Sequence, residues 1–215
     1  MKTTLIYVHD PMCSWCWGFT DVYQQLLEQL PREVGIRRLV GGLAPDSDVP
    51  MAESMQAMLQ QTWRRIEATI PGTQFNFEFW NRCVPRRSTY PACRAVIAAR
   101  EQGEQYDPMM TQAIQQAYYQ QARNPSDNET LIELAGEIGL DVDRFTKQLL
   151  DPNTHQQLLD EINSARSIGL DSFPSLMLEH GGQYYPILSN YTNVEPILSQ
   201  INADLVLKSF KKSLL

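Results

Sequence analysis

Two cysteines separated by two residues, in the sequence Cys13-Ser14-Trp15-Cys16, are the residues of this chain with the clearest capacity for chemistry. Such a pair can exchange a dithiol for a disulfide, because one thiolate attacks a disulfide and the second thiol resolves the mixed disulfide. The pair follows an apolar run at residues 5–8 and stands at the start of a helical pattern. We therefore predict a strand that leads into a redox-active helix start.

The helical pattern explains why Cys13 would be the nucleophile. Its apolar residues recur at spacings of three and four, and the pattern ends at Pro31. These residues are Cys16, Phe19, Tyr23, Leu26, Leu27 and Leu30. In the first turn of a helix, backbone N–H groups lack acceptors and the helix dipole is positive, so a thiolate there is stabilised. The pKa of a free thiol, about 8.5, falls to roughly 3.5–7.5 in such sites.

A metal site or a haem attachment site is the alternative use of such a pair. Zinc needs two further ligands, but Cys83 and Cys93 have an unlike spacing, and the histidines are scattered: His9, His155 and His180. Haem attachment requires a histidine after the second cysteine, where this chain has Trp17. We therefore expect a redox-active dithiol with no metal and no cofactor. A structural disulfide or a metal site is the alternative to that interpretation of the pair.

The composition disfavours two classes of function. The 215 residues contain 18 Lys and Arg against 25 Asp and Glu, a formal net charge of −7, which argues against nucleic-acid binding. No apolar run approaches the roughly 20 residues of a membrane span. No charged and apolar leader precedes the first predicted strand. We therefore expect a cytoplasmic protein with no membrane and no nucleic-acid partner.

The order of the other patterns indicates the fold. A second strand is expected at residues 34–40, so the chain opens with strand, helix and strand, a unit whose strands are parallel. Residues from about 51 to 169 have a helical character throughout. A hairpin near residues 175–188 and a last helix, opened by a capping box at residues 192–195, complete the pattern.

This order predicts an α/β protein with a thioredoxin fold and an inserted all-helical domain. The halves of the thioredoxin fold are expected at residues 1–48 and 171–215, and the helical insertion at residues 49–170. The insertion contains methionines at helical spacing, namely Met51, Met55 and Met58. They fit either core packing or a peptide groove, and we expect core packing.

Two segments of the chain resemble the DsbA-like thioredoxin superfamily. They are Asp10-Pro11-Met12-Cys13-Ser14-Trp15-Cys16-Trp17-Gly18-Phe19 and Ser172-Phe173-Pro174-Ser175-Leu176. Within it they are most similar to the branch of predicted bacterial protein-disulfide isomerases related to FrnE. The resemblance covers essentially the whole chain and implies a thiol–disulfide oxidoreductase, isomerase or reductase, that acts on protein or peptide disulfides. Glutathione or a thioredoxin-type reductant is a further implied partner.

The resemblance also implies roles for individual residues. Cys13 would be the attacking thiol, Cys16 the resolving thiol, and Pro174 a cis-proline that faces them. The backbone of Phe173 would then pair with a bound peptide as a strand does.

Aromatic residues near the dithiol offer further substrate contacts. Trp15, between the two cysteines, is expected to stay exposed and to contact an apolar substrate, with Trp17 beside it. Cys83 and Cys93 are expected to be inert buried thiols, because no helix-start CxxC surrounds either of them.

The chain departs from the family pattern at the carboxylate that thioredoxins place beneath the dithiol. Residues 5–8 contain none, so Asp10 and Asp21 are the nearest candidates, and we expect Asp21 on a helix surface. His9 is expected to be structural, with tuning of the thiolate as the alternative. The dipeptide Ser14-Trp15 leaves the direction of exchange open, because known dithiols span roughly −270 to −120 mV.

Two other functions fit the same pattern. Glutathione-dependent transferases and isomerases of the kappa-like type resemble the same inserted fold, but they do not need a resolving thiol, and Cys16 therefore argues against them. A peptide-binding or chaperone module without catalysis is the second alternative.

Overall fold

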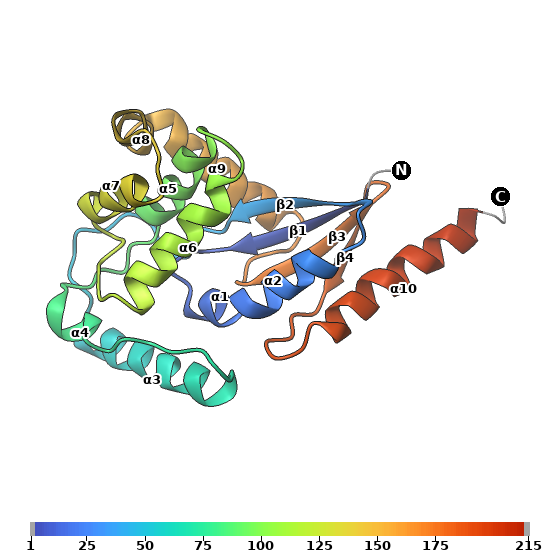
Figure 1. Ribbon diagram of the computed structural model, residues 1–215, viewed down its shortest axis with the longest axis horizontal. Helices are drawn as coiled ribbons and strands as arrows, with labels where there is room; N and C mark the ends of the chain where they lie inside the picture. Colours follow the sequence, from blue (N-terminus) through green and yellow to red (C-terminus); the bar gives the residue numbers. More distant parts are fainter. Residues whose placement is uncertain (1–2, 213–215) are drawn as a thin grey trace.

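A four-stranded sheet in the order β2-β1-β3-β4 forms the centre of the protein. The computed structural model describes the backbone of residues 3–212 and the side chains of residues 3–203. The strands are β1 (Thr3–His9), β2 (Val34–Val40), β3 (Ser175–His180) and β4 (Gln183–Ile187) (Figure 1). β1 and β2 are parallel, whereas β3 is antiparallel to both β1 and β4. The predicted order of strands along the chain, the parallel first pair and the hairpin are thus confirmed.

The segment between β2 and β3 is helical, as expected, and stands at the carboxyl ends of β1 and β2 (Figure 1). The helices of the chain are α1 (Ser14–Gly18), α2 (Thr20–Gln29), α3 (Glu53–Thr69), α4 (Phe79–Arg82), α5 (Tyr90–Arg100), α6 (Tyr106–Tyr119), α7 (Asn128–Glu137), α8 (Val142–Leu149), α9 (Pro152–Ser167) and α10 (Glu195–Lys212). None of the described helices is long and apolar enough to cross a membrane.

The alternation of side chains along β1 divides the core of the sheet into two layers. Leu5 and Tyr7 pack with apolar side chains of α2 and α10 on one face. Ile6 and Val8 pack on the other face with Ala165 of α9. The last helix of the expected insertion therefore covers the sheet itself, and it links the two parts of the fold.

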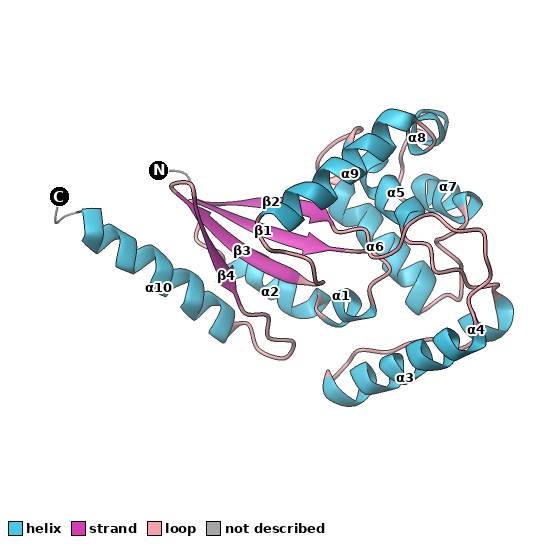
Figure 2. Cartoon of the chain, turned by 180° about the vertical axis from the view of Figure 1, so that it is seen from behind, coloured by secondary structure: helices cyan, strands magenta, loops and turns pink. Residues whose placement is uncertain are grey.

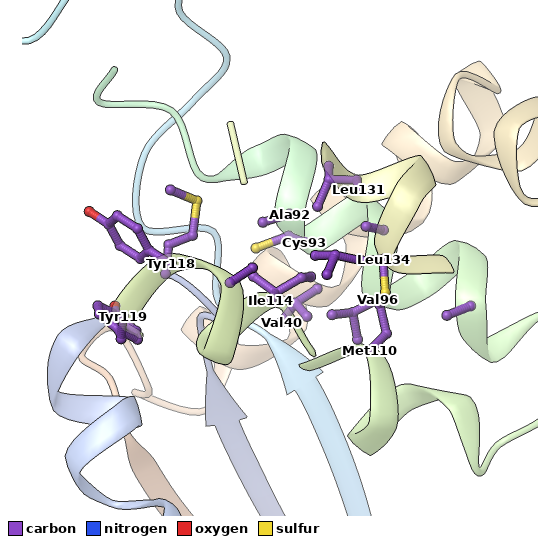
Figure 3. Close-up of a cluster of buried hydrophobic side chains, with 14 of the residues drawn as sticks. Val40, Ala92, Cys93, Val96, Met110, Ile114, Tyr118, Tyr119, Leu131 and Leu134 are labelled. Carbon is purple, nitrogen blue, oxygen red and sulfur yellow. The ribbon is translucent and has the colours of Figure 1, made fainter. Parts of the chain in front are cut away.

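A second buried cluster fills the helical segment and continues to the end of the sheet (Figure 3). Its labelled members come from β2, α5, α6 and α7 and are Val40, Ala92, Cys93, Val96, Met110, Ile114, Tyr118, Tyr119, Leu131 and Leu134. Because Val40 belongs to both β2 and this cluster, the helical segment is packed directly against the strand ends beside the dithiol.

Three local expectations differ from the structure. The helix expected in one piece breaks between α1 and α2, where α3 approaches so closely that a Cβ on Gly18 would lie 2.6 Å from Ile70 Cδ1. The methionines are not core residues as a group, because Met51 is buried whereas Met58 is 48% exposed. They belong to or precede α3, which lies beside α4 (Figure 2) and joins the buried cluster through Trp63 and Ile66. The expected capping box is replaced by Asn193, whose Oδ1 accepts the N–H of Glu195 at 2.9 Å.

Candidate active site

The dithiol lies where β1 turns into α1. Cys13 is the N-cap residue of α1 with an extended backbone (φ −82°, ψ 117°), and Cys16 lies one turn later. Asp10 holds this turn, because its carbonyl accepts the N–H of Cys13 at 3.0 Å and its Oδ1 accepts the N–H of Met12 at 2.8 Å. Both thiols are free, and Cys13 is 7% exposed whereas Cys16 is fully buried. Only the first thiol therefore has access to a substrate.

The two thiols have opposite shifts in acidity. Hydrogen bonds from the Cys16 thiol, and from the N–H groups of Cys16 and Trp15, lower the pKa of Cys13, although burial and the charge of Asp10 oppose them. Burial and the neighbouring Cys13 sulfur raise the pKa of Cys16 well above the usual value. Cys13 is therefore the thiol that ionises first, as the helix-start argument predicted.

A second chain segment reaches the dithiol from before β3. The Phe173–Pro174 peptide is cis, as the resemblance implied. The thiol of Cys13 donates to the carbonyl oxygen of Phe173 at 3.5 Å. The Phe173 ring lies against the backbone of Gly41, where an added Cβ would stand 2.0 Å from Cε1 of that ring. A glycine after β2 is thus required for Phe173 to reach Cys13.

The two tryptophans of the motif have different surroundings. The ring of Trp15 is partly buried, packs edge-on against Tyr191 at 5.2 Å and has the Arg65 guanidinium 5.1 Å from its centre. The ring of Trp17 stacks on Tyr119 at 5.7 Å and its Nε1 donates to a backbone carbonyl. Trp17 is thus partly buried, as Trp15 is, but it does not line the cleft beside Cys13, and its contact with a substrate stays a prediction.

A cleft of about 310 Å³ opens beside Cys13. Its walls come from the CxxC turn, the segment after β2, α3, the segment before α5 and the segment before β3. The lining residues are Met12, Cys13, Ser14, Trp15, Leu43, Met51, Leu59, Thr62, Trp63, Arg86, Arg87, Thr89, Tyr118, Asp171, Ser172 and Phe173. The cleft thus combines an apolar wall with two arginines.

No sequence pattern predicts this cleft. Its cationic part is the adjacent pair Arg86-Arg87, but Arg37-Arg38 and Arg64-Arg65 are similar pairs, so the pair alone does not mark a site. Arg86 is bound to Asp127 at 2.6 Å. Arg87 makes no ion pair with any carboxylate of residues 3–203. Arg87 is therefore the cation of the cleft that is available to a ligand.

Two of the polar residues that the sequence left open now have a place. Asp21 lies exposed on α2, as expected, and Asp10 is fully buried beside the dithiol. His9 is fully buried as well, and burial together with the charge of Arg38 lowers its pKa to about 3. A neutral His9 carries no charge that could stabilise the Cys13 thiolate, so the tuning alternative is not supported.

The other two cysteines are separated. Cys93 is fully buried in α5, and its pKa is raised well above the usual value, mainly by burial. Cys83 is only partly buried and donates to the carbonyl oxygen of Ala122 at 3.2 Å. Within residues 3–212 no group of three His, Cys, Asp or Glu side chains could hold a metal ion.

Comparison with known proteins places the chain among thioredoxin-like proteins. A thioredoxin family model matches residues 6–185. The crystal structure of "a putative protein disulfide isomerase from Nitrosomonas europaea" is 27% identical, with a TM-score of 0.83 over 96% of this chain and 99% of that one. The cytosolic disulfide reductase DsbM from Pseudomonas aeruginosa is 23% identical, with a TM-score of 0.74 over 95% and 99% of the chains. DsbM is also known with GSH.

Curated relatives match at lower coverage of their own length. The ClpXP adapter protein SpxH of Halalkalibacterium halodurans is 24% identical over 78% of this chain and 56% of its own length. SpxH of Bacillus subtilis is 23% identical over 91% of this chain and 66% of its own. The chain thus spans between about half and two thirds of the relatives it matches.

Proposed function

We propose a function for this chain from its family and its site. The chain belongs to the thioredoxin family, whose model covers residues 6–185. We propose that it exchanges thiols and disulfides in protein or peptide substrates through Cys13 and Cys16. The observation that carries the proposal is the opposite acidity of two thiols one helical turn apart. Cys13 has a lowered pKa and access to the cleft, whereas Cys16 is buried with a raised pKa. A nucleophile needs a lowered pKa and access to the substrate, and a thiol one turn away can resolve the mixed disulfide once it loses its proton.

The exchange proceeds in two balanced steps. The Cys13 thiolate attacks one sulfur of the substrate disulfide, the substrate S–S bond breaks, and the released thiolate takes a proton from solvent. Cys16 then loses its proton and attacks the Cys13 sulfur, which releases the second substrate thiol. Two electrons and two protons pass from the dithiol to the substrate. If another thiolate of the substrate attacks the substrate sulfur of the mixed disulfide before Cys16 does, Cys13 leaves as the thiolate and the substrate keeps a rearranged disulfide with no net change of oxidation state.

The cleft supports a substrate with an apolar and an anionic part. Trp15 and Phe173 line it next to Cys13, and we propose that both contact the substrate. We propose that Pro174, which follows Phe173 through the cis peptide, belongs to the same site. Arg87, without a carboxylate partner among residues 3–203, fits a carboxylate of an acidic peptide or of glutathione. The structure of DsbM with GSH supports glutathione as the partner that restores the dithiol.

We propose the direction of a reductase or isomerase in the cytoplasm. The cytosolic disulfide reductase DsbM is similar in fold over most of the chain. A cytoplasmic glutathione pool would keep such a pair reduced unless its potential is unusually low. The Trp15 ring beside the nucleophile supports substrates with apolar residues near their disulfide.

Trapping of the mixed disulfide tests this proposal. Cys16→Ser should accumulate a long-lived adduct with a disulfide-containing peptide at Cys13, because the resolving thiol is missing. Cys13→Ser should accumulate none, and Cys83→Ser, the matched control for loss of a thiol outside the site, should turn over like the unmodified protein. Mass spectrometry of the adducts reads out all three. Equal trapping by Cys16→Ser and Cys13→Ser would reject the division of roles, and full activity of Cys13→Ser would favour a binding module.

A further inference from the structure

Asp10 is a fully buried carboxylate that the proposed exchange does not consume. Its Oδ1 accepts the N–H of Met12 at 2.8 Å, and its Oδ2 accepts the N–H of Leu43 at 2.7 Å and the hydroxyl of Thr89 at 2.7 Å. The thiol of Cys93 donates to Oδ2 as well, at 3.5 Å. Every one of these partners is a donor, which is the arrangement that an ionised carboxylate requires.

The four donors come from separate parts of the cleft wall. Met12 belongs to the CxxC turn, Leu43 to the segment after β2, Thr89 is the N-cap residue of α5, and Cys93 lies inside α5 within the cluster of Figure 3. Met12, Leu43 and Thr89 all line the cleft beside Cys13. Asp10 therefore fixes three segments of the substrate cleft around one pair of oxygens.

The charge of Asp10 has no counter-ion. No ion pair joins it to a Lys or Arg side chain within residues 3–203. Burial raises the pKa of Asp10 while its donors lower it, and its charge raises the pKa of both Cys13 and Cys16. The other titratable groups that face Asp10 or the two sulfurs are Cys93, Tyr7, Tyr118, Tyr119 and Tyr191, and the nearby cation of the cleft is Arg87.

We propose that Asp10 is a positioning residue which holds the cleft and, as an uncompensated charge beside the dithiol, makes the Cys13–Cys16 pair more strongly reducing. The charge opposes the thiolate of the reduced form but has no such effect on the neutral disulfide. The disulfide form is therefore favoured, and the pair gives its two electrons and two protons to a substrate disulfide more readily. This inference rests on the proposed exchange function and adds the direction of electron transfer, from the dithiol to the substrate disulfide.

The four donors favour Asp10 as a fixed charge, because an ionised carboxylate is the form that accepts all of them. A proton on Oδ2, which accepts three of these hydrogen bonds, would displace one of the donors. A fixed charge changes the equilibrium between dithiol and disulfide, whereas a proton carrier changes the rate at which Cys16 resolves a mixed disulfide.

Equilibration of the full chain with reduced and oxidised glutathione tests the inference. In Asp10→Asn, the equilibrium constant for forming the Cys13–Cys16 disulfide should fall about tenfold, a potential about 30 mV more positive. Thiolate absorbance should also show Cys13 ionising at lower pH than in the unmodified protein. An equilibrium constant within twofold of that of the unmodified protein, or a larger one, would overturn the inference. So would an unchanged equilibrium constant together with slower attack of Cys16 on the mixed disulfide.

Variants that remove a donor act through the protonation of Asp10. Cys93→Ala and Thr89→Val remove hydrogen bonds that lower the pKa of Asp10, so a larger share of its carboxyl is protonated. Their constants should therefore fall below that of the unmodified protein at the same pH, and the difference should be larger at pH 6 than at pH 8. They carry the test if Asp10→Asn does not fold, and a rise or no change in both at either pH would reject the role of the charge. Failure of the unmodified Cys13–Cys16 pair to equilibrate with glutathione or any peptide disulfide would instead reject the proposed function.

Discussion

Two regions of buried charge meet at the end of β1, and they are built in opposite ways. His9 and Asp10 are consecutive and both fully buried. Asp10 faces neutral donors and the dithiol, whereas His9 faces an ion-pair network made of Arg38, Arg100, Asp107 and Glu161. The first region leaves a buried charge without a counter-ion, and the second compensates every charge it buries.

The ion-pair network joins the sheet to the helical segment. Asp107 of α6 binds Arg38 of β2 at 2.5 Å and Arg100 of α5 at 2.6 Å. Glu161 of α9 binds Arg100 at 2.5 Å and accepts the N–H of Val40 at 2.8 Å.

The acidity of the two buried aspartates follows this difference. The two arginines lower the pKa of Asp107 despite its burial, whereas burial raises the pKa of Asp10, which has only neutral donors. A compensated buried charge therefore holds the structure, and an uncompensated one is free to act on the chemistry beside it.

The largest effect is expected from breaking the compensated region. Asp107→Asn leaves two partly buried arginines without their shared carboxylate, so the free energy of unfolding should fall by about 3–5 kcal/mol. Chemical denaturation measures it. Glu133→Gln is the matched control, because it breaks an exposed pair with Arg123 and should cost less than about 1 kcal/mol. An equally small loss in both variants would contradict the structural role of the network.

Acid should weaken the same region through His9. Its folded pKa of about 3 lies below the unfolded value of about 6.5, so the unfolded state binds a proton that the folded state does not. Stability should therefore fall from pH 6.5 toward pH 3, by at most about 1.4 kcal/mol per pH unit from this group, and be independent of His9 above pH 6.5. The lowered pKa of Asp107 adds a loss of the same sign, confined to more acidic conditions.

Denaturation of His9→Gln across this pH range isolates the histidine. In His9→Gln the free energy of unfolding should lose much of its dependence on pH between pH 6.5 and 4. The control His155→Gln, which replaces a partly buried histidine, should keep that dependence. A slope unchanged in His9→Gln would mean that His9 is not held neutral by its surroundings.

The sequence predicted the features that depend on neighbours along the chain. The dithiol at a helix start and the order of strands and helices along the chain follow from local spacing and from turn residues, whereas the place of Pro174 came from the family resemblance. Asp10 and Asp21 look alike in the sequence, and what separates them is contact with Leu43 and Thr89, which lie 33 and 79 positions from Asp10. The partner of Arg38 is likewise 69 positions away.

The methionines show the same limit. Periodicity gives the apolar face of α3 but not what covers it: Met51, just before the helix, is buried, whereas Met58 is 48% exposed. Met51 and Leu59 also line the cleft, so α3 supplies a wall of the candidate site. Spacing left both core packing and a groove open, and only contacts between distant segments distinguish the two.

The rate of alkylation of each cysteine across pH tests the central claim most directly. Mass spectrometry after brief exposure of the folded protein to a small alkylating reagent should show Cys13 reacting first. The pH at which Cys13 reaches half of its maximal reactivity should lie below about 8.5, the pKa of a free thiol, because hydrogen bonds to its sulfur lower the pKa of Cys13. Cys16 and Cys93 should stay nearly unreactive, since both are buried with raised pKa values. Faster reaction at Cys83 or Cys93, or a midpoint for Cys13 at or above the free-thiol value, would contradict the account.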